Sequence, residues 1–204
     1  MKFNKAAMFG LDARIALAIF GALSVISGAA LYSAIQQAKA EQYRQYFESI
    51  TKASEQYYLD NGKPLPEHTS GHNIYTADLV TNRESLSTWN GPYLQTNSNG
   101  GMNFRDSITA SIGSTVYMYA YLEKISTWPS DRRCATNDAD CAEYYSLYST
   151  ADADAKAALE KVFNMLDDLV DNGDGALDGK VRSVSASNNT YHVNYQGIMR
   201  KRTN

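Results

Sequence analysis

The residues best suited to chemistry lie in an acidic stretch near the end of the chain, LDDLVDNGDGALDGK (166–180). Carboxylate and amide oxygens are the ligands that Ca²⁺ prefers in proteins. The stretch is no EF-hand, because placing Gly175 sixth in such a loop puts Val170 where the first aspartate belongs. Two interpretations stay open, a calcium site and a polar turn that leads into the last strands. The candidate ligands are Asp171, Asn172, Asp174 and Asp178.

A second chemical pair is formed by Cys134 and Cys141, which enclose six residues and are the only cysteines of the chain. So short a loop closes easily, and a disulfide persists in an oxidising compartment. A metal site needs further cysteine or histidine ligands at the usual spacing, and the sequence offers none. We therefore expect a disulfide that pins a surface loop.

Two classes of function are disfavoured by motif and charge. The sequence lacks the GxSxG, HExxH and Walker motifs that mark common hydrolases and nucleotide-binding enzymes. Lys and Arg number 19 against 22 Asp and Glu, so the net charge of −3 provides no basic field for a nucleic acid. We expect a protein that is not an enzyme and has no nucleic-acid partner.

The element that dominates the N-terminal part is an apolar run of 21 residues without charge, from Ile15 to Ile35. A helix of that length spans roughly 30 Å, the thickness of a bilayer's hydrocarbon core. Lys2 and Lys5 precede it, and a basic head before an apolar run stays in the cytoplasm while the rest crosses. The sequence predicts a transmembrane helix over residues 11–36.

The helix is expected to continue beyond the membrane over residues 37–60, where apolar side chains recur at spacings of three and four. Asn61-Gly62 supplies a stop, and residues 61–204 then form a soluble α+β domain. Alternating tyrosines favour a strand over a helix at 114–125. Residues 151–170 read as a helix and 180–196 as a hairpin. The expected fold class is α+β, a long N-terminal helix packed on a small antiparallel sheet.

Residues 1–10, a basic leader that ends in Gly10, precede this helix in an order that resembles the type IV pilins and the pseudopilins of type II secretion. Three further segments, YYLDNGKPLP (57–66), ADLVTN (77–82) and WNGPYL (89–94), are similar to the major pseudopilins, so the resemblance covers residues 8–94. It implies that a prepilin peptidase cuts after Gly10 and methylates Leu11. It also implies an inner-membrane anchor with the C-terminal domain in the periplasm.

The resemblance further implies a structural subunit that assembles into a filament with its own copies or with other pilin-like subunits. The family usually has Glu five residues into the mature chain, whereas this chain has Ile15. Asp12 is the candidate replacement, unless Arg14 pairs with it instead. Ser24 and Gly28 are small residues one turn apart, a spacing that lets membrane helices approach closely. Major pseudopilins carry a calcium loop near their C-terminal strands, which favours Ca²⁺ at the acidic stretch.

An alternative function is an anchored binding module, either a minor tip pilin or adhesin, or a chain whose leader is never cleaved. Its 15 tyrosines suit recognition, because tyrosine offers a large contact area at a low entropy cost. The segment 96–150 is absent from a minimal major pseudopilin and favours this alternative.

Overall fold

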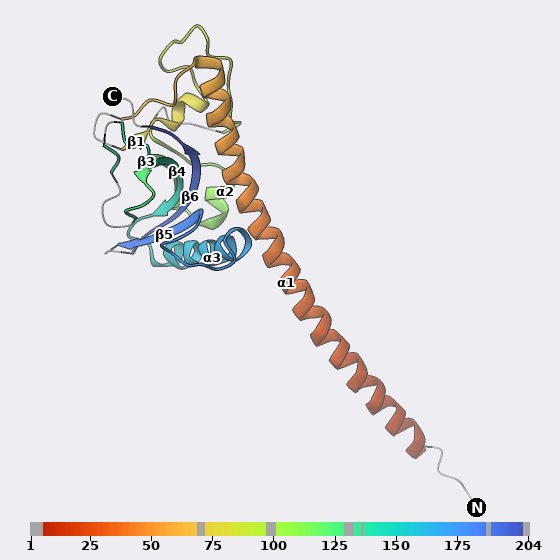
Figure 1. Cartoon of the computed structure of the whole chain (residues 1–204). Coiled ribbons are helices and arrows are strands. Elements are labelled where there is room, and N and C mark those ends of the chain that lie inside the picture. The colour runs from red at the N-terminus through yellow and green to blue at the C-terminus, as the bar shows by residue number, and fades with distance from the viewer. Residues whose placement is uncertain are drawn as a thin grey trace, which may run out of the picture. The chain divides into compact units, whose positions relative to one another are not determined.

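The computed structural model divides the chain into two compact units, residues 1–39 and 40–204. One helix, α1 (Ala6–Asn61), contributes to both units. The elements are labelled along the chain in Figure 1. The residues that the structure describes are 6–68, 72–96, 101–128, 133–135, 137–186 and 189–201.

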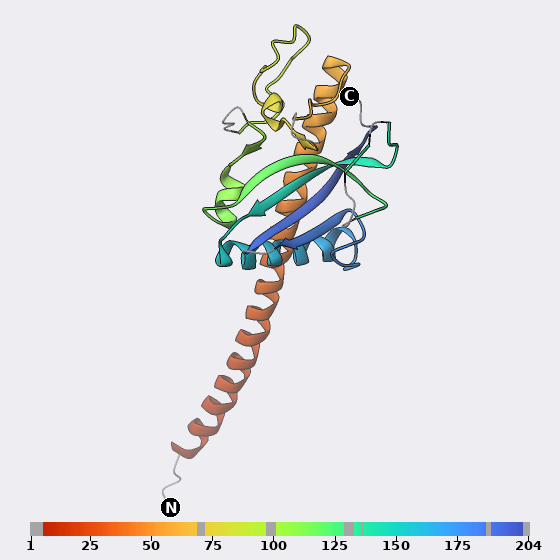
Figure 2. The same cartoon turned by 90° about the vertical axis from the view of Figure 1, so that its left-hand side faces the viewer.

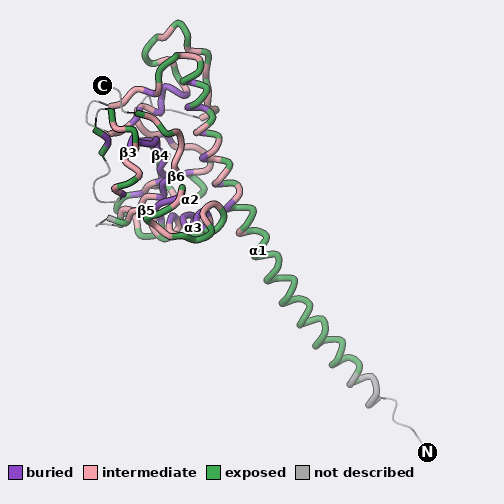
Figure 3. The backbone as a smooth tube through the Cα atoms, viewed as in Figure 1, coloured by how far each residue is buried: buried purple, intermediate pink, exposed green. Residues whose placement is uncertain are grey.

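The first unit consists of the apolar half of α1, which is exposed at every described position from Asp12 to Ile35 (Figure 3). Large side chains such as Leu17 and Val25 are 70% and 73% exposed. The hydroxyl of Ser24 donates to the Phe20 carbonyl at 2.8 Å, so this polar group is satisfied within the helix. The helix is long and apolar enough to cross a membrane.

The second half of α1 is amphipathic and packs on the sheet of the second unit. Tyr43, Phe47 and Ile50 lie on its buried side, and Phe47 and Ile50 have no exposed surface. The helix ends at Asn61, because Gly62 has a φ of +66° and its N–H donates to the Tyr58 carbonyl at 2.8 Å. The predicted continuation and stop are both confirmed.

The second unit is built on an antiparallel sheet whose strands are ordered β1-β3-β4-β6-β5, with β2 also paired to β3. The strands are β1 (Asn73–Ile74), β2 (Asn103–Phe104), β3 (Tyr117–Lys124), β4 (Cys141–Ser149), β5 (Val181–Ala186) and β6 (Thr190–Met199). The remaining elements are the 3₁₀ helix η1 (Thr76–Leu79) and the helices α2 (Ser107–Ile112) and α3 (Ala153–Val170). The α+β class is thereby confirmed.

Helices α1 and α3 share one face of this sheet, and the main core lies between them and the strands (Figure 2). Phe47 of α1 stacks on Tyr195 of β6, with ring centroids 5.0 Å apart. Leu159 and Leu166 of α3 join the same core. Because side chains alternate along a strand, Tyr121 and Tyr144 point to the opposite face, where Trp128 covers them in a smaller cluster.

The predicted strand at 114–125, the helix at 151–170 and the C-terminal hairpin are all present, as β3, α3 and the pair β5–β6. The sequence analysis missed β4, which lies at the centre of the sheet between β3 and β6. Both faces of β4 are covered, so its residues show no alternation of apolar and polar types. Its charged residue Glu143, which argues against a buried strand, is itself buried.

Candidate functional site

The residues expected to act in processing and assembly lie along the exposed apolar half of α1. Gly10 and Leu11 are both helical, and the side chain of Leu11 lies outside the described residues. Asp12 and Arg14 are exposed, and no ion pair joins them among the interactions of the described residues. Residues two apart on a helix do not face each other, so both charges are available to other groups.

Ser24 and Gly28 lie one turn apart on this exposed helix, as their spacing requires. A Cβ built on Gly28 meets nothing within 4 Å, so no contact within the chain explains its small size. The pair is one of several groups of small residues along this half of the helix. Small residues one turn apart suit close approach by another helix in lipid.

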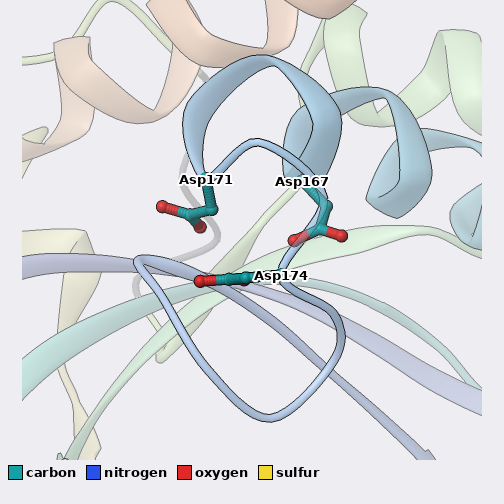
Figure 4. Close-up of side chains that lie close together, drawn as sticks. All are labelled: Asp167, Asp171 and Asp174. Atoms are coloured by element: carbon teal, nitrogen blue, oxygen red, sulfur yellow. The ribbon is translucent and has the colours of Figure 1, made fainter.

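The acidic site brings together three carboxyl groups at the end of α3 (Figure 4). Asp167 lies in the last turn of the helix, Asp171 caps its C-terminal end and Asp174 follows in the loop. One carboxylate oxygen from each lies within 4.8 Å of the other two. Asp167 and Asp171 meet because residues four apart share one side of a helix.

Backbone N–H groups hold these carboxylates in place. The Lys180 and Val181 N–H groups donate to Oδ2 of Asp171 at 2.9 and 2.6 Å, which fastens the loop to the start of β5. The Gly175 N–H donates to Oδ2 of Asp167 at 3.2 Å. Gly179 has a φ of +67°, and a Cβ there would lie 2.5 Å from Cγ of Asp171, so only glycine fits this turn.

The electrostatic environment of the site favours a positive charge over three ionised carboxylates. Burial raises the pKa of Asp167, and the neighbouring carboxylates Asp174 and Asp171 raise this pKa further, although the Gly175 N–H lowers it. The negative end of the α3 dipole adds to the repulsion. Both backbone donors reach Oδ2 of Asp171, and no described hydrogen bond involves its Oδ1. The three carboxylates are the groups of this site that could hold a hard divalent cation.

The structure gathers two of the four predicted ligands, Asp171 and Asp174, and adds Asp167, which sequence reasoning missed. Asn172 is exposed with a φ of 58°, where it shapes the turn, and its place among the ligands stays a prediction. Asp178 is exposed and lies outside the group. The spacing of four between Asp167 and Asp171 at a helix end was the signal that could have found the third carboxylate.

The predicted disulfide is confirmed. Cys134 and Cys141 are bonded, with Cα atoms 6.1 Å apart, and both are buried. The bond ties the segment after β3 to the first residue of β4. It therefore anchors a connection between two central strands as well as a surface loop.

No family model, no curated protein and no solved structure matches the chain.

Proposed function

We propose that this chain is a membrane-anchored subunit of a filament of the type IV pilus or type II secretion pseudopilus kind. The observation that carries the proposal is the apolar half of α1, which has no charge from Ile15 to Ile35 and is exposed on the single chain. An apolar surface of this size does not stay in water. A bilayer covers it before assembly, and the helices of neighbouring subunits cover it in the filament.

Processing and assembly would use the first residues of α1. A prepilin peptidase would remove residues 1–10 and leave Leu11 as the N-terminal residue. The new amine is a charge within lipid, which is costly without a partner. Asp12 of a neighbouring subunit supplies the carboxylate that pairs with it, and Arg14 extends to the headgroups at the cytoplasmic interface. Ser24 and Gly28 then allow the helices to pack closely.

The soluble domain would lie in the periplasm, with the chain held in the inner membrane before assembly. The Cys134–Cys141 disulfide supports this location, because disulfides persist in oxidising compartments. Its partners would be further copies or other pilin-like subunits, and the structural role needs no catalysis.

The proposal is tested by the intact mass of the full chain recovered from membranes that contain an active prepilin peptidase. We expect a chain that begins at N-methyl-Leu11. The Gly10→Val variant should keep its leader, whereas Gly21→Val, the same change within the apolar helix, should be processed normally. A chain that begins at Met1, beside a reference prepilin that is cleaved in the same cells, would exclude this pathway.

A bound divalent cation, for which we propose Ca²⁺, would add order to the soluble domain. Asp167, Asp171 and Asp174 would hold it, and its charge would relieve the repulsion among their carboxylates. Once bound, the cation would join the end of α3 to the loop that leads into β5. Its role would be structural, because the site lies on the scaffold that positions two elements.

A second candidate function, an anchored binding module, is favoured by the tyrosines on the sheet face away from α1. Tyr148 contacts both Tyr117 and Tyr119 there, with ring centroids 5.9 and 4.7 Å apart. Tyr117 is exposed, and exposed tyrosine suits recognition. A chain that keeps its leader in the mass measurement would leave this candidate in place.

A further inference from the structure

A cavity of about 600 Å³ opens where α1 and β6 end, and nothing in the anchoring role uses it. Its walls combine apolar and cationic side chains. Tyr58 and Met199 are each 52% exposed beside it. The residues that matter for the inference are Tyr58, Lys63, Pro64, Met199, Arg200 and Lys201.

The cations of this cavity are held in different ways. The Arg200 guanidinium, only 10% exposed, contacts the Glu143 carboxylate at 3.1 Å and the Glu67 carboxylate at 3.5 Å. Lys63 pairs with Glu84 at 2.7 Å. Lys201 is exposed and belongs to no ion pair among the described residues. The Lys201 ammonium group at this cavity can therefore pair with a carboxylate of another molecule, in a chain whose net charge is −3.

A surface of complementary character lies at the acidic turn after α3. Asp178 is exposed there, and Leu169 and Leu177 are 44% and 53% exposed. The described part of residues 40–204 has six exposed large apolar side chains. Four of them lie at these two surfaces, Tyr58 and Met199 at the cavity and Leu169 and Leu177 at the turn.

The two surfaces are separate, because the turn leads into β5, whose first residue Val181 pairs with Tyr195, whereas the cavity lies beyond that pair at residues 198–201 of the chain. In Figure 2, α3 follows the lower edge of the sheet, and β6 runs from there toward the upper edge, where α1 also ends. The cavity is lined by Lys63 and Met199, which follow or end those two elements at the upper edge. The two surfaces are therefore formed by different residues of one chain.

We propose that the cavity of one copy receives the acidic turn of a second copy, with Leu177 against the apolar wall and Asp178 paired with Lys201. This inference rests on the proposed filament and names a contact between its soluble domains. Contact between two different surfaces is heterologous, and each added copy leaves one cavity and one turn open. Repetition of the contact extends an open assembly, as a filament requires.

The test is zero-length carbodiimide cross-linking of the full chain in the filament fraction of cells that assemble it. Denaturing gels separate linked dimers and longer ladders from intramolecular products, and mass spectrometry of the dimer band maps the linked peptides. We expect a linkage between Lys201 and the 174–178 turn. Asp178→Lys should remove most of this linkage, because two lysines repel each other. The double variant Asp178→Lys with Lys201→Asp should restore a linkage, now between the new lysine at 178 and the new aspartate at 201.

Matched charge changes at other exposed positions, Glu55→Lys and Lys161→Asp, should leave the linkage intact. If filaments form and dimers link only through other residues, or if the paired reversal restores nothing, the inference is wrong while the filament stands. If the unmodified chain yields neither filaments nor linked oligomers, the proposed function itself is wrong.

Discussion

At the residue scale, the pKa of the Asp167 carboxyl group depends on its burial and on its two acidic neighbours. All these influences raise its pKa, and only the Gly175 N–H opposes them. A carboxyl group with a raised pKa in the folded chain destabilises that chain once the pH exceeds its unfolded value, about 4. Below that pH the group is protonated in both states and contributes nothing. The cost therefore appears as the pH rises and is fully present at neutral pH.

The variant Asp167→Asn should accordingly raise the free energy of unfolding at pH 7 in the absence of divalent cations. The gain should disappear as the pH falls below about 4, where both side chains are neutral. Thermal unfolding of the full chain in detergent at several pH values measures this difference. Asp168→Asn, a change at the exposed neighbour, should have little effect at any of these pH values.

Millimolar Ca²⁺ should reverse the order of stability. The unmodified chain should gain melting temperature by mass action, whereas Asp167→Asn should gain much less. A melting temperature of the unmodified chain that does not respond to Ca²⁺ or Mg²⁺ would show that the three carboxylates hold no structural cation.

Arg200 offers a second test at this scale, because its guanidinium pairs with the buried carboxylate of Glu143. Ser54 and Tyr145 also donate to this carboxylate, at 2.8 and 2.7 Å. Arg200→Ala would leave a buried charge without its cation, at a cost of about 3–5 kcal/mol. Urea unfolding of the full chain measures the loss, and Lys201→Ala should change it little. Equal, small effects of both variants would contradict the assigned role of the buried pair.

At the element scale, the amphipathic half of α1 stabilises the domain through side chains that the sheet covers completely. Phe47 is the clearest case, since it is fully buried and stacks on Tyr195. Phe47→Ala should lower the free energy of unfolding by about 3–5 kcal/mol, through lost burial and the cavity that remains. The exposed Gln45→Ala on the same helix is the control. A loss below about 1 kcal/mol would mean that this half of α1 does not form the core.

Elements with local signals could be predicted from the sequence, and elements that depend on distant partners could not. The spacing of Phe47, Ile50 and Tyr57 and the stop at Gly62 are local, so the end of α1 was foreseen. The strand β4 was not, because the partner that makes its Glu143 tolerable, Arg200, comes from the far end of the chain.

The acidic site was foreseen in part for a related reason. The loop residues Asp171 and Asp174 are conspicuous in sequence, whereas Asp167 belongs to a helix and joins them only through the helical turn. Asp178 is equally conspicuous in the sequence, yet it is exposed and lies outside the group of three carboxylates. The density of acidic residues in the sequence therefore locates the site, and the path of the backbone decides which carboxylates meet there.

At the scale of the whole molecule, the proposed function requires that the apolar half of α1 be shielded from water first by the bilayer and then by neighbouring helices in the filament. Gly28→Leu should leave membrane insertion unchanged, because the added side chain is apolar and meets nothing within the chain. It should reduce filament yield, because the large leucine side chain keeps a neighbouring helix from approaching closely at this position. Ala29→Leu, on another side of the helix, should reduce the yield less. Quantitative immunoblots of membrane and filament fractions compare the two variants.

The filament itself is the most direct test of the proposed function. Material sheared from cells or released from the periplasm can be imaged by electron microscopy with antibodies against the soluble domain. The account predicts labelled filaments in which residues 11–35 are protected from protease without detergent, as expected for a core of packed apolar helices. Labelling confined to single molecules in the inner membrane, in cells whose filament machinery is active, would contradict it.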